Sequence, residues 1–144
     1  MKFVRYLLFI SFTTLAGFAC NNARSDQGTE NQISADAPVF TLKDDRVYDF
    51  GKVKEGEIVE KTFAFQNTGK SPLLISNITA SCGCTTPEWP KEPIPPGGES
   101  TIVVRFNSTG KPGQQSKAVT ITANTEPPVI ELFIKGVVEG TQNQ

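Results

Sequence analysis

The sequence predicts an all-β fold, an antiparallel sandwich of about seven strands, and three observations support this prediction. From Pro38 onward, apolar and polar residues alternate with a period of two, which is the pattern of half-buried strands. Clusters of glycine and proline interrupt the alternation at short, regular intervals and predict turns. No amphipathic helix is visible after the first twenty residues, so two facing sheets must form the core.

The first nineteen residues have the pattern of a secretory signal peptide. A basic start over residues 1–5 precedes an apolar run that ends near Leu15, and small residues follow. The apolar run is too short for a comfortable membrane-spanning helix. We therefore expect residues 1–19 to direct export into the cell envelope.

Cys20 directly follows this signal pattern, and the segment 16–20 resembles the lipobox of bacterial lipoproteins. The resemblance implies that the thiol of Cys20 is diacylated, although Gly17 and Phe18 depart from the usual leucine and small residue. The alternative is an ordinary signal cleaved nearby, which leaves Cys20 as a free thiol. Residues 20–37 are polar and predict a flexible tether. We therefore expect a lipid-anchored, periplasm-facing domain over residues 38–140.

Four runs carry the clearest strand alternation and predict the core. Their expected inward-facing residues are Val59, Phe63 and Phe65; Ile102, Val104 and Phe106; Val119, Ile121 and Ala123; and Ile130, Leu132, Ile134 and Val138. Six phenylalanines are expected in the core, namely Phe40, Phe50, Phe63, Phe65, Phe106 and Phe133. Turn signals separate the runs at residues 67–70, 95–98, 109–113 and 126–128. Short strands at this spacing are typical of an immunoglobulin-like β-sandwich.

Composition and motifs exclude several classes of function. The net charge of −1 gives no field suited to nucleic acid. The chain has no histidine, which removes the commonest general base, metal ligand and partner of a nucleophile. No phosphate-binding loop or nucleophile elbow is present, and the carboxylates fall in turns or on exposed strand faces. We therefore expect no nucleic-acid partner, no small-molecule substrate, no cofactor and no conventional catalytic site.

Cys82 and Cys84 form the one chemically distinctive feature of the domain. In an extended backbone, residues two apart project to the same face, so both thiols would share one space. One interpretation is a local disulfide, formed in an oxidising compartment and able to take part in thiol–disulfide exchange. A second is a Cu(I) site, since two thiolates suit this ion. The third is structural, with both sulfurs packed beneath the following loop.

The domain closely resembles the bacterial domain-of-unknown-function family numbered 1573. The resemblance is carried by the motifs Tyr-Asp-Phe-Gly-Lys-Val at 48–53, Asn-Thr-Gly at 67–69, Ser-Cys-Gly-Cys-Thr at 81–85 and Pro-Gly at 96–97. It extends from about Phe40 to Val138. The family implies an exported, immunoglobulin-like interaction domain and places Cys82 and Cys84 at its signature positions, but it implies no established activity.

These observations predict a non-enzymatic binding or scaffolding module tethered in the cell envelope. Its recognition surface is expected at the sandwich-end loops or at an exposed strand edge. The loop 81–96 is the candidate patch for another envelope protein, with Thr85, Pro87 and Trp89 as its contact residues. Trp89 has an equally good alternative role as a plug of the core. The alternatives for function are thiol–disulfide exchange and Cu(I) binding through Cys82 and Cys84.

Overall fold

The computed structural model describes residues 36–140. The expected signal peptide, Cys20 and most of the expected tether lie outside the described residues. The described chain forms eight strands: β1 (Phe40–Leu42), β2 (Val47–Lys54), β3 (Ile58–Asn67), β4 (Ile75–Ala80), β5 (Thr85–Glu88), β6 (Glu99–Asn107), β7 (Gly113–Ala123) and β8 (Val129–Glu139). Residues 36–140 form no helix, and therefore none with the length and hydropathy needed to cross a membrane.

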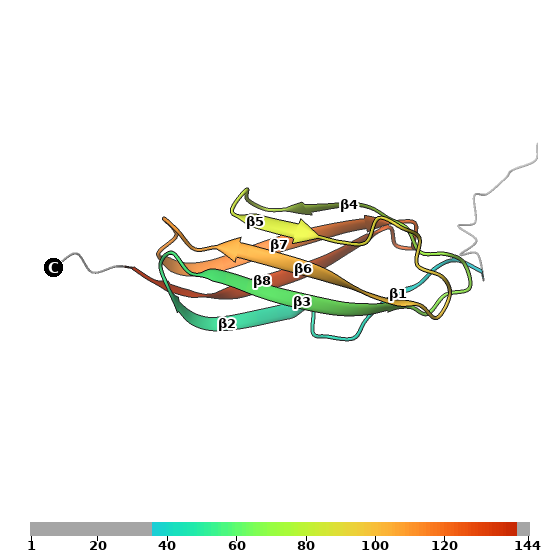
Figure 1. Cartoon of the computed structure of the whole chain (residues 1–144), viewed down its shortest axis with the longest axis horizontal. Coiled ribbons are helices and arrows are strands. Elements are labelled where there is room, and N and C mark those ends of the chain that lie inside the picture. The colour runs from blue at the N-terminus through green and yellow to red at the C-terminus, as the bar shows by residue number, and fades with distance from the viewer. Residues whose placement is uncertain (1–35, 141–144) are drawn as a thin grey trace, which may run out of the picture. The chain divides into compact units, whose positions relative to one another are not determined.

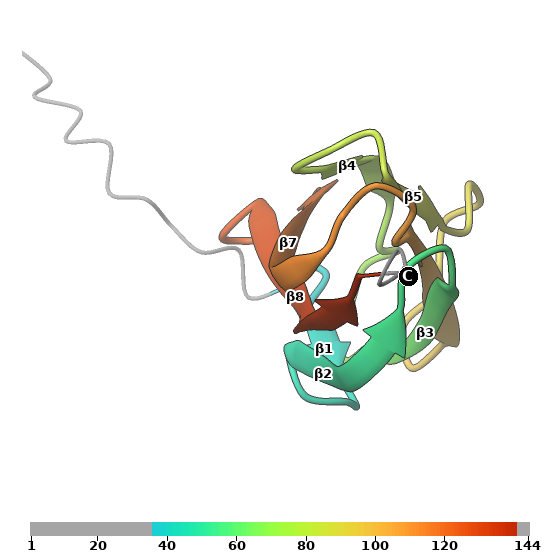
Figure 2. The same cartoon turned by 90° about the vertical axis from the view of Figure 1, so that its left-hand side faces the viewer.

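The strands form two four-stranded sheets that face each other (Figures 1 and 2), which confirms the predicted immunoglobulin-like sandwich. One sheet has the order β1-β3-β6-β5 and the other the order β2-β8-β7-β4. Neighbouring strands are antiparallel except β2 and β8, which pair in parallel. The chain passes from one sheet to the other at every connection except those between β5 and β6 and between β7 and β8.

The predicted inward-facing residues form the core. The central side chains of β3 and β6, including Phe63, Phe65 and Phe106, are fully buried, as are those at the centre of β7 and β8. Phe40 and Phe50 are half-buried at the margin of the core, where their rings stack on Phe65 and Phe106. Alternation therefore identified the apolar face of each long strand.

Phe133 is the exception, and the prediction that it belongs to the core is wrong. Its neighbours Leu132 and Ile134 are buried between the sheets, so Phe133 points to the outer face of β8, where it is only half-buried. There it lies in register with Val47 of β2 and Ala118 of β7. The period of two that predicts Leu132 and Ile134 to face inward also places Phe133 on the opposite face, so the core assignment rested on its aromatic character alone.

One end of the sandwich receives the chain from the N-terminal side, and we call it the proximal end. The carbonyl oxygen of Asp36 accepts a hydrogen bond from the Ser71 hydroxyl, and that of Ala37 accepts one from the Lys70 N–H. The fully buried Asn67 lies at the same end. Residues 36 and 37 therefore already belong to the folded unit.

Asn67 connects three separate segments at the proximal end. Its Nδ2 donates to the carbonyl oxygens of Ser71 and Ile94 at 2.8 and 2.9 Å. Its Oδ1 accepts from the N–H groups of Gly69 and Val39 at 3.1 and 3.3 Å. The Asn-Thr-Gly motif is therefore structural, because its buried asparagine bonds backbone groups of three segments, and those of Val39, Gly69 and Ser71 have no other partner among residues 36–140.

The opposite end, which we call the distal end, contains the turns at 54–57, 81–84 and 108–112 (Figure 1). Ser108 is fully buried there and its hydroxyl lies within hydrogen-bonding distance of the carbonyl oxygens of Lys54 and Glu57, at 3.1 and 2.7 Å. The Asn107 N–H donates to the Cys84 carbonyl at 2.9 Å. These bonds hold the three distal turns against one another.

Candidate functional site

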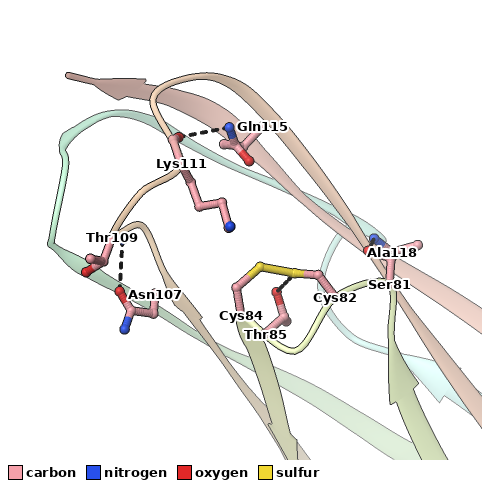
Figure 3. The surroundings of a disulfide bond; sticks show 9 residues. All are labelled: Ser81, Cys82, Cys84, Thr85, Asn107, Thr109, Lys111, Gln115 and Ala118. Atoms are coloured by element: carbon pink, nitrogen blue, oxygen red, sulfur yellow. Dashed lines mark hydrogen bonds between the residues drawn. A yellow bond between two sulfur atoms is a disulfide. The ribbon is translucent and has the colours of Figure 1, made fainter.

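A disulfide joins Cys82 and Cys84 in the turn between β4 and β5, with their Cα atoms 5.2 Å apart (Figure 3). The backbone here is a tight turn and not the extended segment that the sequence argument assumed. The Thr85 N–H closes the turn by donating to the Cys82 carbonyl at 3.1 Å. The two sulfurs therefore meet because the chain reverses, and not because they share the face of a strand.

The disulfide bears on the three interpretations of this cysteine pair. Cys84 packs against the core, as the structural interpretation expects, while remaining only half-buried. A disulfide offers no thiolate to a metal, so the Cu(I) hypothesis concerns the reduced protein and stays a prediction. Within residues 36–140 no three His, Cys, Asp or Glu side chains are grouped so that they could hold a metal ion.

A groove of about 580 Å³ lies beside the disulfide at the distal end, and we call it the distal groove. Its size falls within the usual range of ligand pockets, about 300–1,000 Å³. Four segments contribute to it, namely β3, the disulfide turn with β5, β6, and the loop before β7. Its lining residues are Ile58, Gly83, Cys84, Thr86, Arg105, Asn107, Thr109 and Lys111.

Strand register brings the groove residues together. Ile58 at the start of β3 is paired with Asn107 at the end of β6, and Arg105 is paired with Thr86 of β5. All four side chains point away from the core, because their strand neighbours point into it. The Asn107 Oδ1 accepts the Thr109 N–H at 2.9 Å, which fixes the start of the loop that carries Lys111 (Figure 3).

The two cations of the groove differ in their surroundings. The Arg105 guanidinium lies between Glu60, whose Oε2 is 2.6 Å from Nε, and Glu88, and hydrogen bonds to these carboxylates, first Glu60 and then Glu88, raise the pKa of Arg105. Lys111 forms no ion pair within residues 36–140. The charge of Arg105 is therefore compensated within the protein, whereas Lys111 has no carboxylate partner in the described part of the chain.

The three residues of the 81–96 loop that were predicted to contact a partner protein differ in their burial and in their surroundings. Thr85 is buried, and Pro87 is half-buried on the inward-facing side of β5. Trp89 packs against the core, and the Lys91 ammonium lies 2.9 Å from the centroid of its ring. The buried indole Nε1 has no hydrogen-bond partner. Trp89 thus occupies the position of the core plug, and Thr86 is the β5 residue that reaches the groove.

Sequence reasoning missed Ile58 and Lys111 as residues of the site. Ile58 is 65% exposed at the start of β3, next to the buried Val59. An apolar residue out of phase with the alternation of its strand was the available signal. Lys111 was interpreted only as part of a turn, because nothing in the sequence shows that this turn lies opposite the disulfide.

A second groove, of about 620 Å³, lies on the outer face of β2, β7 and β8. It is lined by Asp49, Gly51, Lys52, Gln114, Gln115, Ser116, Lys135, Gly136 and Val137. Its cations face carboxylates, since Lys52 lies 3.5 Å from Glu139 and Lys135 lies 3.9 Å from Asp49. This groove is therefore balanced in charge, and its residues serve as matched controls for the distal groove.

A family model described as Protein of unknown function (DUF1573) matches residues 41–138. The chain belongs to this family. The match includes both the disulfide and the distal groove, so both are features of the DUF1573 domain of this chain. No curated protein matches the sequence.

Solved structures similar to this DUF1573 domain share its fold at low sequence identity. A protein of unknown function from Porphyromonas gingivalis W83 has a TM-score of 0.64 and 18% identity, over 76% of this chain and 51% of that one. The chain thus corresponds to about half the length of that protein. The ASH/PapD-like domain 7 of human CEP192 has a TM-score of 0.60 and 9% identity, over 94% and 100% of the two chains. The VesB protease of Vibrio cholerae has a TM-score of 0.52 and 11% identity, over 76% and 33%.

Proposed function

We propose that this protein is a cell-envelope lipoprotein whose β-sandwich is a non-enzymatic binding module, with the distal groove as its recognition surface. The observation that carries the proposal is the position of the groove. Residue 36 enters the domain at the proximal end, whereas the turns that contribute to the groove lie at the distal end (Figure 1). A chain anchored through Cys20 joins the domain at the end away from the groove, which leaves the groove accessible.

The outer strand edges support a groove rather than an edge as the recognition surface. β5 is four residues long and contains Pro87, which has no N–H to offer a partner strand. β2 is interrupted by a bulge at Gly51, whose N–H is already taken by the Asp49 carboxylate. β4 has an irregularity between residues 75 and 77. Such features are those that blunt a sheet edge against pairing with another chain.

The residues of the groove also favour binding over catalysis. Its only ionisable side chains are Arg105, held by two carboxylates, and Lys111. The groove thus contains no general base and no nucleophile with an adjacent base. The likeness to the Vibrio protease concerns the fold and a third of that protein's length, so it supplies no residue for catalysis.

The anchor is tested by replacing Cys20 with serine in the full-length chain. We expect the wild-type protein to remain with the membrane fraction after a high-salt wash, and Cys20→Ser to appear in the soluble fraction or to keep its signal peptide. Incorporation of a radiolabelled fatty acid gives a direct readout. Equal labelling and equal membrane association of both proteins would contradict the lipoprotein proposal.

The recognition surface is tested with a photo-crosslinking amino acid introduced at Thr109 in living cells. We expect an adduct with a partner protein that disappears when Ile58→Glu places a charge in the groove. Val137→Glu, a change at an exposed apolar strand residue lining the second groove, should leave the adduct intact. An adduct that survives Ile58→Glu, or is lost equally in both variants, would contradict recognition through the distal groove.

Thiol–disulfide exchange is a second candidate, because half-buried Cys84 lines the groove and an incoming thiolate there has access to the disulfide. In such an exchange the thiolate attacks one sulfur, forms a mixed disulfide and releases the other cysteine as a thiolate. Mass spectrometry in graded redox buffers tests it. A pair that titrates near the potential of periplasmic oxidants supports exchange, and a pair that never changes state excludes it.

A further inference from the structure

We propose that the distal groove binds an extended acidic peptide segment of a partner protein. One carboxylate of the segment meets Lys111, and a neighbouring apolar side chain packs on Ile58 and the disulfide. This inference rests on the proposed function and adds the chemistry of the partner to it.

The charge of the groove favours an anionic group. None of the eight lining residues is acidic, and two are cations. The Arg105 charge is balanced by Glu60 and Glu88 just outside the groove. Lys111 is exposed and is the groove cation that has no carboxylate partner among residues 36–140, so its charge is available to an anionic group of a ligand.

Lys111 is also held in place by its backbone. Its N–H donates to the Ser108 carbonyl at 3.0 Å, and its own carbonyl accepts from the Gln115 Nε2 at 2.9 Å. The side chain extends from this anchored loop toward the disulfide (Figure 3). Lys111 and Cys84 therefore line the same groove, with the lysine side chain directed toward the disulfide.

The uncharged polar groups add further donors around the same position. The Asn107 Oδ1 is already used by the Thr109 N–H, which leaves the Asn107 Nδ2 as a free donor within the described chain. The hydroxyls of Thr86 and Thr109 have no hydrogen-bond partner among residues 36–140. The groove is thus lined by neutral donors and two cations, and the nearby carboxylates are engaged, since Glu60 and Glu88 hold Arg105 and Glu55 accepts the Gly110 N–H at 2.9 Å. This lining suits a carboxylate or backbone carbonyl oxygens of a ligand.

The apolar side of the groove favours a peptide over a free anion. Ile58 is the most exposed large hydrophobic residue of the described chain, at 65%, and the sulfur-bearing Cys84 lines the same groove. A small anion would leave Ile58 in water, whereas an apolar side chain next to the carboxylate would cover it. A single uncompensated lysine is also far less than the several cations that nucleic acid requires.

The test uses the full-length chain with its disulfide intact and a display library of random peptides of about ten residues. We expect the selected peptides to contain Asp or Glu within one or two residues of an apolar side chain. Lys111→Glu and Ile58→Ser should each weaken their binding about tenfold, and higher salt should weaken it further. Lys52→Glu, in the second groove, should bind within about twofold of the wild type, and Lys111→Arg, which keeps the charge, should retain more binding than Lys111→Glu.

Each remaining outcome overturns part or all of the reasoning. Basic or uncharged peptides, or peptides insensitive to Lys111→Glu but lost with Ile58→Ser, overturn the acidic partner and leave the binding groove standing. Competition by millimolar inorganic phosphate that does not depend on Ile58 overturns the peptide as ligand. Peptides insensitive to both substitutions, or no selected peptide at all, overturn this inference, and survival of the Thr109 adduct in Ile58→Glu overturns the proposed function separately.

Discussion

Asn67→Ala tests whether the buried hydrogen bonds at the proximal end hold the fold together. The substitution removes four hydrogen bonds, two donated by Nδ2 and two accepted by Oδ1 of a fully buried side chain. Ile94 keeps the Leu73 N–H as a partner for its carbonyl, so three part-buried backbone groups are left without a partner. A buried group left without a partner costs about 1–3 kcal/mol, which gives a total loss of about 3–5 kcal/mol after partial rehydration.

A loss of this size is a large part of the stability of a domain, which is about 5–15 kcal/mol. Urea unfolding followed by Trp89 fluorescence should show a midpoint lowered by about 2 M, with an m value of about 1–3 kcal/mol/M. Asn77→Ala is the matched control, because Asn77 is exposed on β4 and should change stability by no more than about 0.5 kcal/mol. Equal midpoints for the two variants would refute the argument that Asn67 satisfies otherwise unpaired groups.

Two further predictions concern close packing and acid sensitivity. Gly136→Ala would place a Cβ 2.3 Å from the Phe50 ring, so it should destabilise the fold by about 1–3 kcal/mol and lower the melting temperature. Gly83→Ala is the control, because a Cβ there would meet no atom within 4 Å and should leave the melting temperature unchanged. Equal melting temperatures for the two variants would contradict this prediction. The Ala64 N–H lowers the pKa of Asp44 below its ordinary value of 3.8, so the carboxylate stabilises the fold above that pH and the contribution is lost as the pH falls through the folded-state pKa. The stability difference between the wild type and Asp44→Asn should therefore be largest near neutral pH and shrink in acid, and urea unfolding that shows a constant difference would contradict it.

The core could be predicted because the alternation of apolar and polar residues along each long strand shows which of its faces is buried. In β6 the residues Ile102, Val104 and Phe106 are separated by outward-facing residues, and all three are fully buried. The strand count of about seven was close to the eight observed. The elements hardest to see were β1 and β5, which have three and four residues and are too short for alternation to emerge.

The candidate site could be predicted only in part. The cysteine motif correctly directed attention to the end of the domain that carries the groove, and a local disulfide was one of the three interpretations of the motif. The groove itself needs Ile58 and Lys111, which are far from the cysteines in the sequence and meet them only through the pairing of β3, β5 and β6. Trp89 drew attention because of its chemistry, yet it packs on the core beneath Lys91.

The sequence by itself determined the sandwich, its buried faces and most of its turns, because alternation and turn chemistry are local properties of the chain. Only the tertiary structure decided which distant segments become neighbours. The parallel pairing of β2 with β8 and the meeting of Ile58, Cys84 and Lys111 in one groove depend on strand order and register. Strand order is set by the packing of the whole domain, and no local pattern specifies which strand lies beside which.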